Sequence, residues 1–141
     1  MAKTYDPKKI ILTFRGILVR GYAGGTFINV NREADGFTKS VGASGDVTRV
    51  RSNDRSGTVA VTLQAESPAN DALSAVAIAD ELTGDQTGAL LLKDLNGTTL
   101  IRAEAAWIRK FPEFEYADEG GNREWMFDCA ELEMLVGGNT T

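Results

Sequence analysis

The segment from Thr58 to Leu82 limits the possible folds more than any other part of this 141-residue chain. Residues 58–65 alternate between apolar and small or polar side chains, as in a β-strand with one buried face. A helix is predicted almost directly afterwards, over about residues 68–82. Residues suited to a helix start stand at its beginning: Ser67, Pro68 and Asp71. The remaining segments have the patterns of strands and loops, so the sequence predicts a mainly antiparallel β-protein with one helix.

Turn and loop signals divide the chain further, within one predicted domain, 1–141. The Asn-Gly pair at 96–97, between two apolar runs, is the strongest short signal for a β-hairpin, and a second hairpin turn is predicted at 118–122. The polar, glycine-bearing segment 31–45 is predicted to be an exposed loop or a mobile hairpin arm. Residues 137–141 are predicted to form a flexible tail.

The apolar pattern changes parity near the end of the chain. Trp125, Phe127 and Cys129 share one face of a predicted strand, whereas Leu132 falls on the other. A β-bulge near Ala130 would return both groups to one side, and an edge between two neighbouring subunits would also explain the change.

Composition excludes several classes of active site. The chain has no histidine and one cysteine, Cys129, which removes Cys/His zinc sites and histidine-dependent nucleophilic catalysis. The lone cysteine also excludes an internal disulfide, so we expect a soluble intracellular product with a buried, inert thiol. Trp107 and Trp125 are interpreted as core residues. No apolar run approaches the roughly 20 residues needed to span a bilayer, and we expect no membrane contact, no metal and no cofactor.

Charge is distributed unevenly along the chain, whose net charge is −5. Residues 1–70 contain ten Lys/Arg and six Asp/Glu, whereas residues 71–141 contain five and fourteen. Opposite charges at opposite ends of a molecule would favour head-to-tail stacking of copies, although sequence halves need not be spatial halves. The overall negative charge argues against a protein that binds nucleic acid tightly, because such proteins normally have a basic face.

A cluster of carboxylates is formed by Glu113, Glu115, Asp118 and Glu119. Its spacing matches neither a calcium loop nor a demonstrable glycosidase pair. We interpret it as a solvated hairpin tip.

Arg49, Arg51 and Arg55 form a basic patch beside a predicted turn. Nucleic-acid binding would require interleaved stacking aromatics, which this patch lacks. We expect these arginines to contact an acidic surface of a neighbouring subunit, the alternative being an idle solvated face.

One face of the predicted strand at 58–65 is small, uncharged or acidic, with Thr58, Thr62, Gln64 and Glu66 on it. The solvent-exposed face of any antiparallel sheet would have this composition. The functional interpretation is the wall of a channel, with these four residues facing its lumen.

Several stretches together resemble a known family over nearly the whole chain: Gly45–Thr58, Ser67–Asp71, Gly88–Asp94 with Asn96-Gly97, Ala106–Pro112 and Arg123–Phe127. In their order and in total length they resemble the tail tube protein of contractile-tailed bacteriophages. No single motif is diagnostic, and the resemblance depends on the order.

The resemblance implies a β-barrel-like sandwich flanked by one helix, with no enzymatic activity. It implies hexameric rings stacked into a hollow tube, through which DNA passes without specific binding. A sheath protein would lie outside the tube, and the baseplate and tape-measure proteins would be further partners. The protein would belong to the virion and assemble in the host cytoplasm, with segment 31–45 as an arm reaching the next ring.

Two alternatives remain open at this level. Type VI secretion tubes and pyocin tubes share the tube fold, so the fold alone does not choose among them. A monomeric carbohydrate-binding β-sandwich would need exposed aromatics, and those outside the core pattern are Tyr22, Phe37 and Tyr116.

Overall fold

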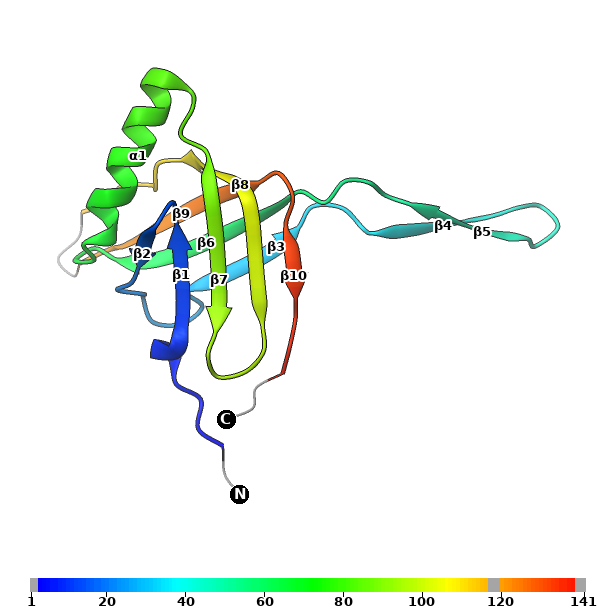
Figure 1. Ribbon diagram of the computed structural model, residues 1–141, viewed down its shortest axis with the longest axis horizontal. Coiled ribbons are helices and arrows are strands. Elements are labelled where there is room, and N and C mark those ends of the chain that lie inside the picture. Colours follow the sequence, from blue (N-terminus) through cyan, green and yellow to red (C-terminus); the bar gives the residue numbers. More distant parts are fainter. Residues whose placement is uncertain (1–2, 117–119, 139–141) are drawn as a thin grey trace.

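The computed structural model describes residues 3–116 and 120–138 (Figure 1). One curved antiparallel sheet forms the body, a single helix packs beside it, and a long hairpin arm projects from one end. The elements are a short 3-10 turn η1 (Pro7–Lys9), β1 (Ile10–Phe14), β2 (Ile17–Val19), β3 (Ile28–Arg32), β4 (Phe37–Val41), β5 (Val47–Arg51), β6 (Gly57–Gln64), α1 (Ala69–Thr83), β7 (Gly88–Asp94), β8 (Leu100–Lys110), β9 (Asn122–Cys129) and β10 (Glu133–Leu135).

The main sheet has the strand order β2-β1-β7-β8-β9-β6-β3, and β10 pairs with β8. The sheet curves until its two ends meet, because the segment that follows β2 forms backbone hydrogen bonds with the last residues of β6. There the Ala23 amide donates to the Thr62 carbonyl (3.0 Å), and the Gln64 amide donates to the Gly21 carbonyl (2.8 Å). The mainly β, antiparallel, one-helix fold expected from the sequence is confirmed.

The interior of this curved sheet is the hydrophobic core. Phe14 on β1 contacts Phe127 on β9 with ring centroids 4.9 Å apart, although two strands separate β1 from β9 within the sheet. Val59, Val61 and Leu63, the predicted apolar face of β6, are fully buried. Trp125 and Cys129 are buried as expected. Trp107 is only half-buried and is not a core residue, because its side chain has the opposite parity to Ala106 and Ile108.

Helix α1 begins and ends one residue later than predicted, at Ala69 and Thr83. The Ser67 hydroxyl accepts a hydrogen bond from the Ala69 amide (3.3 Å), so Ser67 satisfies a free donor at the helix start. Gly84 has a φ of 71° and donates to the Asp80 carbonyl (2.8 Å), which closes the helix. The Trp125 indole donates to the Asn70 side chain (2.9 Å) and fixes the first turn against β9.

The parity change has a different origin from the one predicted. The end of β9, from Phe127 to Cys129, and β10 keep one register against β8, with Cys129 opposite Ala106 and Glu133 opposite Arg102. The register shifts instead between β7 and β8. Gly88 pairs with Ala106 and Leu90 pairs with Ala103, so a step of two residues along β7 matches a step of three along β8. The predicted bulge at Ala130 is therefore wrong, because the extra residue lies in β8 and the β9–β10 segment follows that strand.

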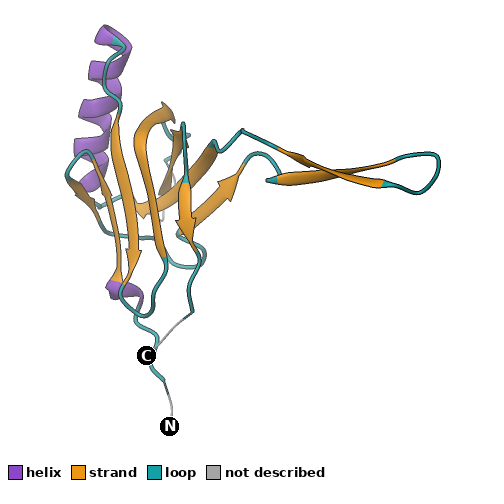
Figure 2. Ribbon diagram, turned by 45° about the vertical axis from the view of Figure 1, so that its right-hand side comes forward, coloured by secondary structure: helices purple, strands orange, loops and turns teal. Residues whose placement is uncertain are grey.

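The segment expected to be an arm forms the two-stranded sheet β4–β5. The hairpin lies further along the chain than the predicted 31–45, because Asn31 and Arg32 belong to β3 and the return strand extends to Arg51. Figure 2 shows the hairpin standing clear of the body in a second orientation.

One predicted hairpin turn and the predicted flexible tail fall partly outside the described residues. Asp118 and Glu119 of the second hairpin turn lie there, as do residues 139–141 of the predicted tail. The first residues of that tail are hydrogen-bonded: the Gly137 amide donates to the Thr99 hydroxyl (3.0 Å), and the Thr98 amide donates to the Gly138 carbonyl (3.3 Å). Within the described part of the chain, no helix is long and apolar enough to cross a membrane.

Candidate functional site

The arm has two chemically different faces. Directly opposed residues of an antiparallel pair point to the same side, so the register Phe37↔Arg51, Lys39↔Arg49 and Val41↔Val47 defines one face. We call these six residues the basic face of the arm. The other face contains only Thr38, Ser40, Thr48 and Val50.

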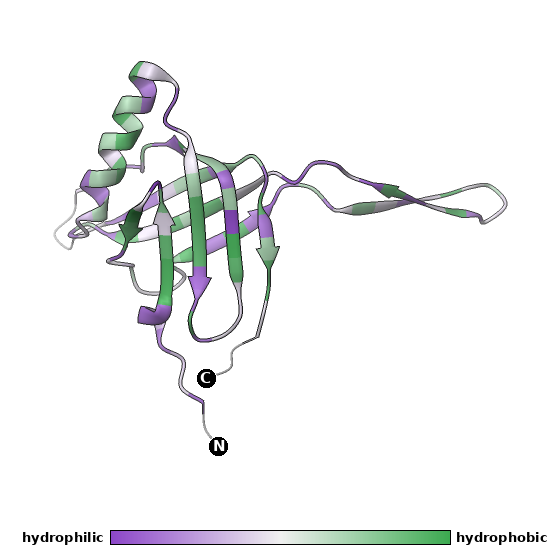
Figure 3. Cartoon of the chain, viewed as in Figure 1, coloured by the Kyte–Doolittle hydropathy of each residue, from purple (hydrophilic) through white to green (hydrophobic). Residues whose placement is uncertain are grey.

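The basic face combines three cations with exposed apolar groups, and the ten strand residues include no acid. All ten are exposed, and Phe37, Val41 and Val47 retain 46%, 60% and 65% of their accessible surface. Figure 3 shows hydrophobic (green) positions on the arm, which projects away from the body. Because apolar side chains gain little from remaining in water, the basic face has the character of an interaction surface.

Two of the three predicted contact arginines lie on this basic face. Arg49 and Arg51 are both on β5, and the Arg49 guanidinium stacks over the Phe37 ring at 3.5 Å from its centroid. Arg55 does not join them, since it lies in the loop between β5 and β6, where its carbonyl accepts from the Leu132 amide (2.8 Å).

Hydrogen bonds around Leu132 fix the direction in which the arm leaves the body. The Arg32 guanidinium donates to the Leu132 carbonyl (3.1 Å from Nε), and the Leu132 amide donates to Arg55. The Glu33 amide donates to the Ser56 carbonyl (3.1 Å) across the root of the hairpin. The arm is thus anchored at its base while its strands are free.

The predicted lumen-facing residues do not form one uniform face. Thr58, Thr62 and Gln64 share the outward side of β6, but Thr58 is buried, Thr62 half-buried and Gln64 exposed. Glu66 lies in the turn after β6, so the prediction that it continues the strand face is wrong. The register places Thr62 opposite Glu124 on β9.

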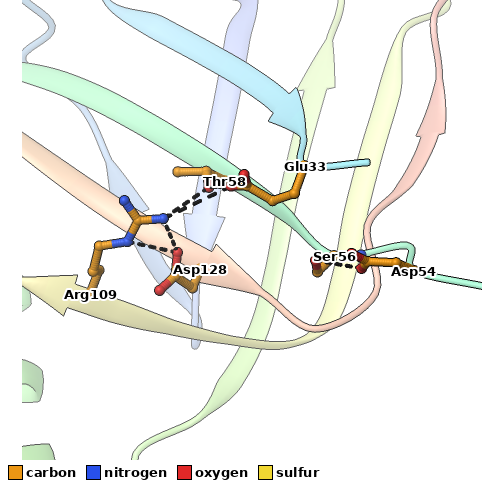
Figure 4. A network of polar contacts seen from close by, with 6 residues as sticks. All are labelled: Glu33, Asp54, Ser56, Thr58, Arg109 and Asp128. Carbon is orange, nitrogen blue, oxygen red and sulfur yellow. Dashed lines mark hydrogen bonds and ion pairs between the residues drawn. The ribbon is translucent and has the colours of Figure 1, made fainter. Parts of the chain in front are cut away.

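A polar network covers Thr58 (Figure 4). Arg109 donates to the Asp128 carboxylate from Nε (2.9 Å) and Nη2 (2.6 Å), and from Nη2 to the Thr58 hydroxyl (3.1 Å). The Thr58 hydroxyl donates to Glu33 at the arm root, and Asp128 raises the pKa of Arg109 by hydrogen bonding and by its charge. Nearby, hydrogen bonds from Ser56 lower the pKa of Asp54. The sequence held no signal for this network, because its members come from β6, β8, β9 and the residue that follows β3.

An acidic groove lies at the far end of β9 from the arm. A cavity of about 290 Å³ there is lined by Lys110, Glu113, Glu115, Gly121, Asn122, Glu124 and Met126. Phe114 and Tyr116 beside it are 61% and 85% exposed and meet edge to face at 4.7 Å. Among the residues that the structure describes, no group of three or more His, Cys, Asp or Glu side chains is arranged to hold a metal ion.

Cys129 is expected to resist modification in the folded protein. Burial, with the charge of Asp128, raises the pKa of its thiol to about 11, so almost no thiolate exists at pH 8. A thiol reagent at pH 8 should react on the order of 100-fold more slowly with native protein than with protein in denaturant. Equal reaction rates for native and denatured protein would contradict the burial of Cys129 on β9.

The fold defines a class of protein. It is similar to the cap that terminates the tube of the anti-feeding prophage (TM-score 0.66, 11% identity, 96% of this chain and 95% of that one). It is also similar to a chain of the sheath–tube complex of an extracellular contractile injection system, PVC (TM-score 0.65, 8% identity, 94% and 92%). At these identities the likeness shows the fold alone, which this chain shares with components of contractile injection systems.

Sequence comparison then gives the family. The chain belongs to the bacteriophage PhiTE tail tube protein family, whose sequence model matches residues 14–137. Structural protein ORF10 of Pseudomonas phage KPP10 is 26% identical over 144 residues, covering 96% of this chain and 83% of that protein. The expected relationship to tail tube proteins is confirmed, and the chain is a structural component of a phage tail.

Proposed function

We propose that this protein is a non-enzymatic tail tube subunit that assembles into stacked hexameric rings around a channel for DNA. The observation that carries the proposal is the arm, a two-stranded sheet with every residue exposed and an apolar, cationic face. A pair of strands without a third strand or a core is marginal in water, so the arm gains its stability from a neighbouring subunit.

The outward side of β6 supports the channel. Thr62 and Gln64 are uncharged, Glu124 is opposite Thr62, and the cation Arg109 is neutralised by Asp128. Such a surface offers DNA phosphates no free cation on this strand, so DNA would pass without specific binding.

The partners follow from the same proposal. A sheath would surround the tube, and the name of the similar PVC structure gives a complex of sheath and tube for that assembly. The baseplate and tape-measure proteins would complete the tail, with assembly in the host cytoplasm before the tube becomes part of the virion.

Electron microscopy of the purified protein over a range of concentrations tests the proposal. We expect hollow rings or tubes with six-fold symmetry at high concentration and smaller species on dilution. Monomers at every concentration, with or without added baseplate, would contradict it and favour a monomeric binding module, which a glycan screen would then test. Rings that pack a protein cargo in place of DNA would favour a secretion tube.

A further inference from the structure

The arm and the acidic groove lie at opposite ends of the same two strands. β6 and β9 pair along their whole length, with Gly57 opposite Cys129 at the arm root and Gln64 opposite Asn122 at the groove. Eight residues of strand separate the two ends by roughly 26 Å. In Figure 1 the arm also points away from the start of β9, so it cannot fold back onto the groove of its own chain.

The two surfaces are complementary in charge. The basic face has three cations, Lys39, Arg49 and Arg51. The lining of the groove has three glutamates, Glu113, Glu115 and Glu124, against one lysine, and one further cation, the Arg123 guanidinium, lies over the neighbouring Phe114 ring at 4.5 Å from its centroid. Glu66 adds to this end of the molecule, because its carboxylate lies 3.1 Å from the position of a Cβ at Gly120.

The surfaces are also complementary in their apolar groups. Phe37, Val41 and Val47 interrupt the cations of the arm, and the exposed Phe114 and Tyr116 alternate along the chain with Glu113 and Glu115, which line the groove. Packing apolar side chains between the ion pairs would exclude water, which strengthens arginine–carboxylate hydrogen bonds relative to an open surface.

We propose that the basic face of the arm of one copy docks against the acidic groove, and against the exposed Phe114 and Tyr116 next to its glutamates in the chain, on a second copy. The proposal rests on the proposed function, since it names the contact that joins neighbouring subunits. Each copy then uses one arm and one groove, and the contact is heterologous.

Charge reversal at each surface separately gives a sharp test. One variant carries Arg49→Glu and Arg51→Glu; the other carries Glu113→Arg and Glu115→Arg. All four side chains are exposed, so both variants should fold, and the slow reaction of Cys129 verifies this. A matched control, Thr38→Glu with Thr48→Glu, places the same number of acids on the opposite face of the arm.

Each variant alone should need about tenfold or more protein to assemble, because its arm and groove now repel each other. An equimolar mixture should recover assembly, since the acidic arm of one variant meets the basic groove of the other and the wild-type surfaces also meet. The quadruple variant should recover by itself, and the control should assemble like the wild type.

Failure of both the mixture and the quadruple variant to recover would overturn the proposal, as would normal assembly of either double variant alone. Analytical ultracentrifugation of the mixture measures the contact even if the wild type forms no tubes. A complex formed only by the mixture would support the docking contact while the tube proposal fails.

Discussion

Replacing Gly57 with valine is expected to lower the free energy of unfolding by about 3 kcal/mol. A Cβ at this position would lie 2.5 Å from Cδ2 of the buried Leu132 and 2.8 Å from the Asn31 carbonyl oxygen. The leucine could adjust its rotamer, but the carbonyl belongs to β3, which pairs with β6 and cannot move without breaking that ladder. The same change should redirect the arm, because Leu132 fixes its root.

Denaturant titration followed by tryptophan fluorescence measures the first effect, and electron microscopy measures the second. Gly36→Ala is the matched control, since a Cβ there meets nothing within 4 Å and the change should stay within about 0.5 kcal/mol. A loss below about 1 kcal/mol for Gly57→Val would mean that β3 and β6 are not packed as closely as described.

Replacing Phe127 with alanine is expected to cost about 3–5 kcal/mol. Its ring is fully buried and contacts Phe14 across the interior, so the substitution leaves a cavity where the two sides of the curved sheet meet. Since domains of this kind are stable by about 5–15 kcal/mol, a large share of the total stability would be lost.

Thermal and denaturant unfolding of Phe127→Ala should be compared with Phe114→Ala, whose ring is exposed. The Phe114 variant should unfold like the wild type. If the two variants were equally stable, the sheet would not close through the Phe14–Phe127 contact.

Local signals in the sequence predicted the local elements well. Helix α1 was predictable to within one residue at each end because the residues that favour a helix start act within a few positions of it. The Asn-Gly pair does lie between β7 and β8, although the connection is longer than two residues, with Leu95 to Thr99 between the paired strands.

Features that depend on two distant strands were not predictable. The sequence shows the parity change between Cys129 and Leu132, but its origin is the register between β7 and β8, earlier in the chain. Thr58 has the pattern of a wet strand face, yet it is covered by Arg109 from β8. The alternation of residue types predicts which side chains share one face of a strand. It does not predict which side chains of another strand cover that face.

The candidate surfaces were predicted in part. Arg49 and Arg51 are brought together on the arm, whereas Arg55 remains in the loop at its root. Glu113 and Glu115 were interpreted as a solvated hairpin tip, and sequence spacing had no means of placing them at the opposite end of β6 from the arm. That relation comes from the antiparallel pairing of β6 with β9.

Separating the arm from the groove along one strand pair has a consequence for growth. A stack held by this contact has polarity: one terminus presents unused arms, and the other presents unused grooves. Addition at the two termini therefore involves different chemistry, and an initiating structure needs to match only one of them. Because every added layer recreates the same free terminus, the subunit cannot count layers, and the final length has to be set by another molecule.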